Sequence, residues 1–241
     1  MVGPVFASAI PILSVPMWVQ LVAVVFGGIS GTIVGRRSEF DLAGVVALAI
    51  VTGLGGGIVR DILLQHGPPL ALRNNDYILV AVATGLFGAG APTTIASLLT
   101  KIQWPFTLLD AIFVAIYGAI SADMALQLNL PAAPCVMIGV IGGVGGSVLR
   151  DVFANNRPEL FRPGTLYAVP TALGISLYVF VVRVLNVGNW FVLPAMAFIV
   201  ILRMVAVWRR WSLPEVADDV YLFAQLRTRV KKINERRRRQ S

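Results

Sequence analysis

The chain has little of what a soluble enzyme needs. Its 241 residues include one cysteine, one histidine and only 13% charged side chains, whereas a soluble domain carries about 25%. Cys135 alone cannot form an internal disulfide, and His66 alone argues against a histidine-based metal site or catalytic triad. No spaced carboxylate pair and no nucleophile motif is present in the sequence. We therefore expect no cofactor, no metal site and no enzymatic activity.

Apolar residues are abundant instead, at 57% of the chain with a mean hydropathy of +0.79. Most of the surface must then face something other than water, which predicts an all-α integral membrane protein. A helix needs about 20 mostly apolar residues to cross a bilayer. Seven stretches qualify as transmembrane helices: residues 17–35, 42–64, 77–99, 106–126, 132–154, 166–185 and 190–208.

Positive charge gathers at the C-terminal end, where ten of the 20 Lys and Arg residues lie between Arg209 and Arg239. Basic segments remain in the cytoplasm, so seven spans in a cell (inner) membrane place the N-terminus outside and the C-terminus inside. The tail could also touch anionic lipid. We expect no nucleic-acid partner, because nothing else resembles a nucleic-acid module. Residues 214–234 fit either an amphipathic surface helix or a partly disordered tail.

One glycine-rich pattern occurs twice, 90 residues apart. Residues 53–61 read GLGGGIVRD and residues 143–151 read GVGGSVLRD; at the same offset Pro68, Leu70 and Tyr77 match Pro158, Leu160 and Tyr167. Upstream, Phe26 to Gly31 resembles Phe113 to Gly118 if one loop carries a small insertion. Each copy holds three spans, an odd number, so the second must enter the membrane from the opposite side. The sequence predicts two inverted three-helix repeats plus a seventh helix.

This organisation divides the chain into five segments. They are an N-terminal extension (1–16), a first three-helix repeat (17–99), a second, inverted repeat (100–186), the seventh transmembrane helix (187–211) and a basic cytoplasmic tail (212–241). Inverted repeats with glycine-interrupted helices at corresponding places favour a transport pathway. The alternative is a duplication that only built a stable bundle.

The glycine clusters themselves admit two interpretations. Consecutive glycines lower the cost of leaving helical geometry, and freed carbonyls are tolerated only against protein or a water-filled path. The clusters would then be kinks that shape a pore. Small residues also let two helices approach closely. We favour the first interpretation for Gly55, Gly56 and Gly57 and for Gly145, Gly146 and Ser147.

Charged residues beside the clusters are expensive in lipid. Arg60, Asp61, Arg150 and Asp151 either snorkel to the interface or line a pathway or gate. Neighbouring residues point in different directions on a helix, so we expect the partners of these arginines to come from elsewhere. The topology pairs Arg150 with Asp110 and Arg60 with Asp123, and exchanging Arg150 and Asp110 should then restore function. Arg203, inside the seventh span, either snorkels or meets an acidic partner. Tyr77 and Tyr167 are either interfacial anchors or pathway residues.

At these residues the chain resembles the prokaryotic trimeric intracellular cation (TRIC) channel family. The resemblance implies a homotrimer in which each protomer has its own pore, helices kinked at the glycine clusters, and passive flow of monovalent cations, potassium or sodium. Ser147 departs from a third glycine in the second copy. The Lys-Glu-Val lipid motif of animal members is absent, so phosphoinositide binding is not implied. Bacterial relatives linked to glycine make a secondary carrier for a small amino acid the alternative function.

Overall fold

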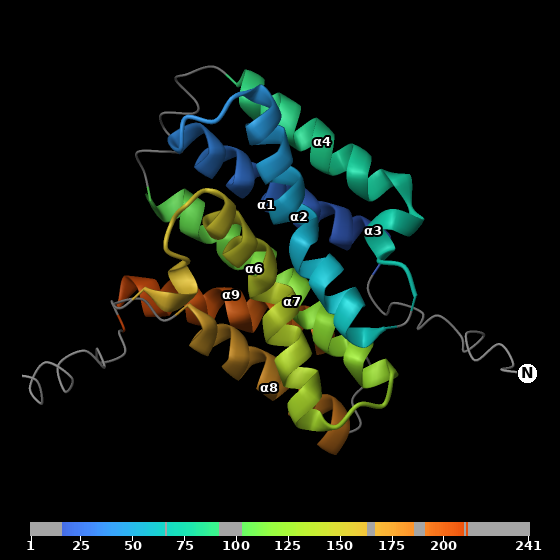
Figure 1. Ribbon diagram of the computed structural model, residues 1–241. Coiled ribbons are helices and arrows are strands. Elements are labelled where there is room, and N and C mark those ends of the chain that lie inside the picture. Colours follow the sequence, from blue (N-terminus) through green and yellow to red (C-terminus); the bar gives the residue numbers. More distant parts are fainter. Residues whose placement is uncertain are drawn as a thin grey trace, which may run out of the picture.

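The computed structural model describes residues 16–65, 67–91, 103–162, 167–185, 191–209 and 211, and over these residues it is helical, without a strand (Figure 1). The seven long helices are α1 (Met17–Arg37), α2 (Leu42–Leu64), α4 (Asn75–Gly90), α6 (Gln103–Gln127), α7 (Ala132–Phe153), α8 (Ala168–Val184) and α9 (Val192–Trp208). The short helices α3 (Leu70–Arg73) and η1 (Glu159–Phe161) precede α4 and α8. The predicted all-helical membrane fold is confirmed.

Four of these helices, α1, α2, α6 and α7, are long and apolar enough to cross a bilayer by themselves. Helices α8 and α9 are apolar but only 17 residues long. Large apolar side chains remain exposed on the outer helix faces, among them Phe87, Phe180 and Ile201. Such a surface suits lipid, and the chain is a multi-pass membrane protein. Residues 214–234, for which the sequence left two interpretations open, lie outside the described residues.

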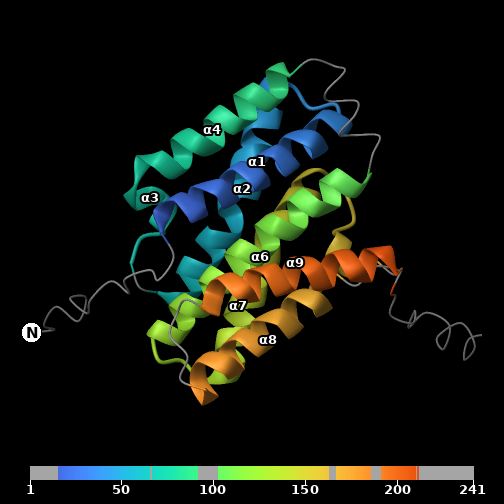
Figure 2. The ribbon, with the colours of Figure 1, turned by 180° about the vertical axis from the view of Figure 1, so that it is seen from behind.

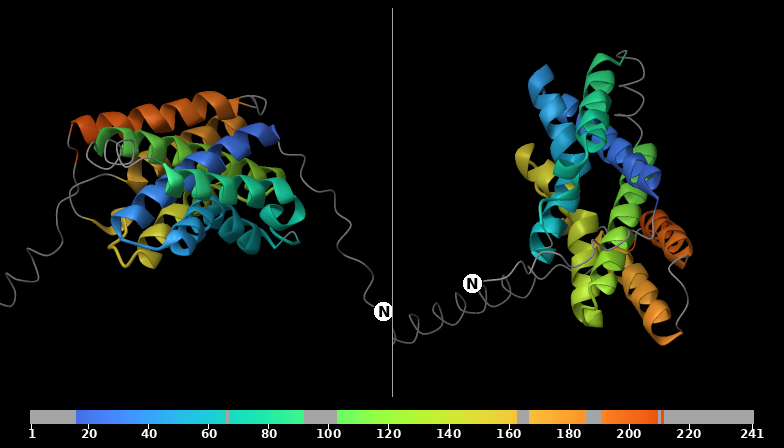
Figure 3. Two further views of the ribbon diagram at one scale, coloured as in Figure 1. Left: turned by 90° about the horizontal axis from the view of Figure 1, so that it is seen from above. Right: turned by 90° about the vertical axis from the view of Figure 1, so that its right-hand side faces the viewer.

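The helices form two groups of three. Helices α1, α2 and α4 pack on one another, as do α6, α7 and α8. Helices α2 and α7 join the groups, and α9 packs on α6 and α8 (Figures 1 and 2). Figure 3 shows the two groups from two further directions. Phe113, fully buried on α6, packs between them, because its ring lies beside both Gly27 and Gly146.

The repeat extends to the turns that end the helices. Among the described residues, four that are not glycine have left-handed backbone. Glu39 and Asn129, at φ 58° and 57°, follow α1 and α6, and Gln65 and Asn155, at φ 51° and 53°, follow α2 and α7. Left-handed residues commonly end helices, where they let carbonyls of the last turn be satisfied. Both pairs are 90 residues apart, so each half stops its first two helices at matching positions.

Contacts between the first two helices of each half correct one predicted correspondence. A Cβ on Gly53 would lie 3.0 Å from the Val24 oxygen and 3.5 Å from the Gly28 nitrogen. A Cβ on Gly143 would lie 2.8 Å and 3.2 Å from the same atoms of Val114 and Gly118. Gly28 therefore corresponds to Gly118 at an offset of 90. The predicted match of Gly31 with Gly118, and the loop insertion that it required, are wrong. The sequence match relied on apolar residues, which recur at several helical spacings and so fit more than one offset. The close contacts of glycines fit one offset alone.

Candidate functional site

Helices α2 and α7 cross at the two glycine clusters through reciprocal backbone contacts. A Cβ on Gly56 would overlap the carbonyl oxygen of Gly142, and a Cβ on Gly146 would overlap that of Thr52. Positions 52 and 142 are themselves 90 residues apart, so the crossing obeys the pseudo-two-fold relation of the repeats. The helical hydrogen-bonding pattern continues through both clusters. Close approach is thus a direct role of these glycines, and the kink stays a prediction.

The remaining cluster positions fill the same crossing. A Cβ on Gly145 would lie 3.3 Å from Gly56 Cα, and one on Gly55 would lie 2.8 Å from a Leu149 methyl group. Ser147, which replaces a third glycine, is buried, and its hydroxyl lies within hydrogen-bond distance of the Val144 carbonyl, at 2.9 Å, and of the Tyr167 hydroxyl. Because the Tyr167 proton goes to Asp110, the single proton of Ser147 is shared between these two acceptors. The second cluster therefore adds a polar group that links α7 to the beginning of α8.

Tyr117 of α6 covers the first cluster. Its ring lies 3.0 Å from the position of a Cβ on Gly57, and its hydroxyl donates to the Gly53 carbonyl over 2.8 Å. This carbonyl lies inside α2 and receives a donor from another helix. Side chains that hydrogen-bond into a helix in this way are one cause of local bending. The sequence analysis missed Tyr117, whose position in an apolar span gave no signal.

Each arginine beside a cluster pairs with its own neighbour in the chain. Arg60 Nε lies 2.8 Å from Asp61 Oδ1, and Arg150 Nε lies 2.8 Å from Asp151 Oδ1. The expectation that the partners come from elsewhere is incomplete: the long arginine side chain folds back to reach the neighbouring carboxylate, and Arg150 has a second partner on another helix, Asp110. All four residues are at most 5% exposed, so the arginines do not snorkel.

The aspartates use their second oxygen to hold the chain that follows each helix. Asp61 Oδ2 accepts from the Leu70 amide over 2.7 Å, and Asp151 Oδ2 accepts from the Glu159 amide over 3.1 Å. Each aspartate thereby joins a buried arginine to the short helix that follows, α3 or η1. The mirror-related arrangement makes both aspartates positioning residues for the ends of the bundle.

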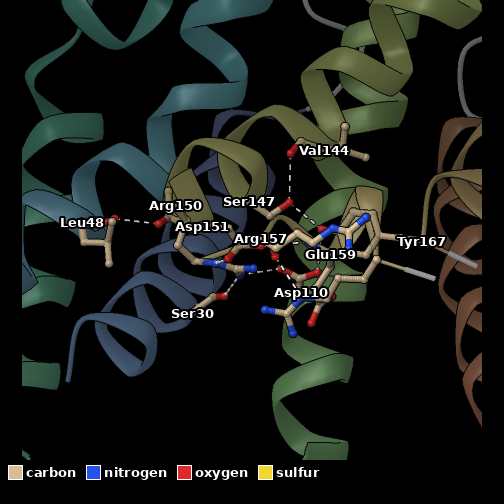
Figure 4. Close-up of polar contacts among 12 residues, drawn as sticks. Ser30, Leu48, Asp110, Val144, Ser147, Arg150, Asp151, Arg157, Glu159 and Tyr167 are labelled. Atoms are coloured by element: carbon tan, nitrogen blue, oxygen red, sulfur yellow. Dashed lines mark hydrogen bonds and ion pairs between the residues drawn. The ribbon is translucent and has the colours of Figure 1, made fainter. Parts of the chain in front are cut away.

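Asp110 of α6 lies at the centre of a buried polar cluster (Figure 4). Arg150 Nη1 donates to its Oδ1 over 2.9 Å, which confirms the predicted pairing. Arg203 Nη2 and the Tyr167 hydroxyl both donate to its Oδ2, over 2.6 and 2.8 Å. Arg150 also donates to Ser30 Oγ over 2.6 Å. Three helices, α6, α7 and α9, and the start of α8 thus meet at one fully buried carboxylate, Ser30 of α1 joins them through Arg150, and Arg203 has an acidic partner.

A neutral version of this cluster lies in the other half. The Tyr77 hydroxyl donates to Gln20 Oε1 over 2.8 Å, the same length as the bond from Tyr167 to Asp110. Gln20 and Asp110 are 90 residues apart, as are the two tyrosines. Both tyrosines are less than 10% exposed, so they are buried cluster residues rather than interfacial anchors. Asp110 is charged, unlike Gln20, and Arg203 of α9 provides an additional positive charge beside it. Helix α9 has no counterpart in the repeat.

Asp123, near the other end of α6, is buried and hydrogen-bonded. Its Oδ1 accepts from the Tyr178 hydroxyl over 2.7 Å, and its Oδ2 accepts from Gln127 over 2.8 Å. Its predicted pairing with Arg60 stays a prediction. Over the described residues, no three His, Cys, Asp or Glu side chains come together as metal ligands.

Glu159 of η1 stands at the edge of the Asp110 cluster. Its Oε2 lies 3.8 Å from Arg203 Nη2, and its side chain is 35% exposed. Burial raises the pKa of Glu159 and the negative charge of Asp110 raises it further, whereas Arg203 and Arg150 lower it. Within the described part of the chain, Arg203 Nη1 is buried and has no hydrogen-bond partner. The sequence analysis missed Glu159, although it follows the repeated Pro158.

Together the fold and these clusters define a multi-pass membrane protein of two inverted three-helix repeats that cross at glycines, plus a seventh helix. One family profile, described as "Glycine transporter", matches residues 17–92 and again residues 107–183, one match in each half. The chain belongs to this family.

Relatives in sequence and in structure agree with this assignment. A "UPF0126 membrane protein" of Deinococcus radiodurans is 35% identical over 158 residues, which cover 65% of this chain and 72% of the relative. The "UPF0126 inner membrane protein YadS" of Escherichia coli is 30% identical, with 65% and 74% covered. A TRIC cation channel of known structure superposes with a TM-score of 0.73 at 28% identity, covering 82% of this chain and 95% of that channel. The TRIC orthologue from Rhodobacter sphaeroides gives 0.70 at 25%, covering 80% and 97%.

Proposed function

We propose that this protein is a channel for monovalent cations, permeable to potassium, with a pore inside each protomer of a homotrimer. The proposal is supported by its structural relatives, which are described as trimeric intracellular cation channels and as conducting cations. The pore would run between the two inverted halves, past the crossing of α2 and α7.

The observation that carries the proposal is the reciprocal glycine crossing. Backbone carbonyls can replace part of the hydration shell of a permeating cation, and the crossing places the carbonyls of Thr52 and Gly142 where no side chain separates the two helices. Kinks at Gly55 to Gly57 and at Gly145, Gly146 and Ser147 would turn further carbonyls toward the path.

The buried arginines do not oppose this function, because each has an acidic partner. Arg60 pairs with Asp61, Arg150 pairs with Asp151 and Asp110, and Arg203 pairs with Asp110. Three cations therefore face three carboxylates, and a passing cation meets no net positive charge from these clusters. In this view the paired residues fix the walls at both ends of the path and serve as its gates.

Recording from purified protein in planar bilayers tests the proposal. We expect unitary currents whose reversal potential follows the potassium gradient when chloride is varied independently. Substituting Gly56→Val should abolish these currents, since the new side chain would overlap Gly142, whereas Gly90→Val at the end of α4 should leave them, because nothing lies within 4 Å of a Cβ there. Silent bilayers for the wild-type protein would overturn the proposal.

The assembly and orientation belong to the same proposal. A homotrimer predicts a particle with three times the protomer mass in detergent. The basic tail predicts an inner membrane protein with its N-terminus outside and C-terminus inside, and the tail would rest on anionic lipid. A protease added to right-side-out vesicles should then leave a C-terminal tag intact.

A carrier for a small amino acid such as glycine is the second candidate. The family description favours it, and inverted repeats around a midplane crossing also suit alternating access. The two candidates differ in a direct measurement: a carrier gives saturable glycine uptake into proteoliposomes without unitary currents, whereas a channel gives unitary currents without it.

A further inference from the structure

Glu159 lies beside Arg203, whose guanidinium has a buried nitrogen without an acceptor among the described residues. Arg203 is 2% exposed, and its Nη2 is shared unequally, at 2.6 Å from Asp110 Oδ2 and 3.8 Å from Glu159 Oε2. Its Nη1 is buried without an acceptor among the described residues. An unsatisfied buried donor costs about 1–3 kcal/mol. The carboxylate of Glu159 is therefore a candidate second acceptor for this guanidinium.

The surroundings of Arg203 let it move between the two carboxylates. Its guanidinium lies over the ring of Tyr167, 3.7 Å from the ring centre. This stack constrains the guanidinium plane but allows it to slide along the ring. Asp110 can release Arg203 and keep two donors, because Arg150 still binds Oδ1 and Tyr167 still binds Oδ2. If Arg203 moved a short distance toward Glu159, both Asp110 and Glu159 would therefore have hydrogen-bond donors.

The charges that face Glu159 are balanced without it. They are Asp110 from α6, Arg150 and Asp151 from α7, and Arg203 from α9, with the Tyr167 hydroxyl at the start of α8. On its own segment Arg157 and Arg162 flank it, with Arg162 Nε donating to the Arg157 carbonyl. Arg157 and Arg162 are exposed, whereas in the buried cluster two cations already meet two carboxylates, so an ionised Glu159 adds one negative charge in excess to that cluster. Protonation removes this excess, in keeping with the raised pKa of Glu159.

We propose that Glu159 is a positioning residue that competes with Asp110 for Arg203, and that one proton on Glu159 decides the competition. Ionised Glu159 draws Arg203 away and loosens the joint between α6 and α9. Protonated Glu159 returns Arg203 to Asp110 and tightens that joint. Acid thus locks this end of the bundle. Nothing in the repeat supplies such a latch at the other end, where Gln20 is neutral.

Thermal unfolding of the purified protein as a function of pH tests the proposal without reference to transport. A carboxyl with a raised folded pKa stabilises the fold below its unfolded value, near 4.5, and this contribution is lost as pH rises through the folded pKa. Glu159→Gln mimics the protonated form, so the difference in Tm, wild type minus variant, should fall with rising pH by about 2–4 °C. Glu39→Gln, at an exposed carboxylate, should show no such fall.

The part played by Arg203 has its own readout. Removing this cation with Arg203→Gln should move the midpoint of the Glu159-dependent fall to higher pH, because Arg203 would no longer offset the repulsion between Asp110 and ionised Glu159; Arg203→Lys should move it less. Each unit of displacement is about a tenfold change in the protonation equilibrium. A midpoint that does not move, or a Tm difference that is flat with pH, would overturn the proposal.

A second experiment, current recording as a function of pH, rests on the proposed channel function. Currents should decrease on acidification in the wild type and in Glu39→Gln, and should stay at the acid level at every pH in Glu159→Gln. Currents that keep the wild-type pH profile in Glu159→Gln would overturn the latch and leave the channel standing. A protein that shows the Tm behaviour but no current at any pH would keep the latch and overturn the channel.

Discussion

Gln20 and Asp110 occupy mirror-related positions in the two halves, and each accepts a tyrosine hydroxyl at 2.8 Å. One is neutral and the other is ionised, with two arginines around it. The two ends of an otherwise symmetric bundle therefore differ in how they are held together. A neutral hydrogen bond joins Tyr77 to Gln20 at one end, whereas ion pairs of Asp110 join α6, α7 and α9 at the other.

Neutralising the central carboxylate should unfold the protein at a lower temperature. Asp110→Asn leaves Arg203 without its closest ion-pair partner and Arg150 with Asp151 alone, and breaking a buried pair costs about 3–5 kcal/mol. Asp110→Asn combined with Arg203→Gln should recover a large part of this loss, because it removes the unpaired cation. Unfolding in detergent measures both, with exposed Asp76→Asn as the control. Equal losses in the single and double variants would contradict the argument.

Exchanging Arg150 and Asp110 should not restore the protein. The sequence predicted rescue from a simple pair, but Asp110 also binds Arg203 and Tyr167, and Arg150 also binds Asp151. The exchange would set an arginine at position 110 against Arg203 and an aspartate at position 150 against Asp151. We expect the double variant to unfold at least as readily as Asp110→Asn. A Tm equal to that of the wild type would show that the pair acts alone.

A carboxylate placed at the mirror position should be poorly tolerated. Gln20→Asp introduces a buried acid into a half that has no counterpart of Arg203 from α9. The acid is left to protonate or to remain under-compensated, with an expected cost of about 1–3 kcal/mol. Gln65→Asp at an exposed site serves as the control for the same chemical change. The destabilisation of Gln20→Asp should also grow as pH rises, since the ionised form is the costly one.

Small substitutions at the crossing should be costly in both halves. Gly56→Ala and Gly146→Ala each push a methyl group into a carbonyl of the facing helix, and overpacking of this kind costs about 1–3 kcal/mol. Gly90→Ala should be neutral or slightly stabilising, since its Cβ meets nothing and alanine favours the helix. If the two crossing variants differ greatly in Tm from each other, the crossing is not reciprocal in solution.

Removing the hydroxyl of Tyr117 at the first glycine cluster should change channel gating while leaving the packing of its ring unchanged. Tyr117→Phe keeps the ring against Gly57 but frees the Gly53 carbonyl, so stability should fall by about 1 kcal/mol only. Under the proposed function, the released carbonyl becomes available to a permeating cation, and open probability in bilayer recordings should rise. Tyr178→Phe, which removes the hydroxyl that donates to Asp123 Oδ1 instead, is the matched tyrosine control.

The sequence predicted the fold well because hydropathy and repetition are long-range signals. The predicted span at residues 42–64 has the bounds of α2, and α7 differs from its prediction at one end by one residue. Pairing of Arg150 with Asp110 was also predictable, since topology placed both at one end of the bundle. The register of α1 against α6 was not, because interchangeable apolar residues fit several offsets.

Other site residues carried no sequence signal. Tyr117, Ser30 and Gln20 are single polar residues in apolar spans, and their roles depend on which helix faces them. The pairing of Arg60 with Asp61, and of Arg150 with Asp151, depends on the conformation of a flexible side chain rather than on helical spacing. Arg203 was correctly placed inside the last span. Whether it extends to the membrane interface or pairs with Asp110 could not be predicted, because this depends on how α9 packs against α6.

The reciprocal crossing of α2 and α7 has a consequence for how the chain could be assembled. Because Gly56 meets Gly142 as Gly146 meets Thr52, the contact would be satisfied equally by two copies of a single three-helix unit inserted in opposite orientations. These two carbonyl contacts do not distinguish one half from the other. The ion pair of Asp110 with Arg203 from α9, in contrast, is present in one half alone among the described residues and makes the two ends of the bundle different.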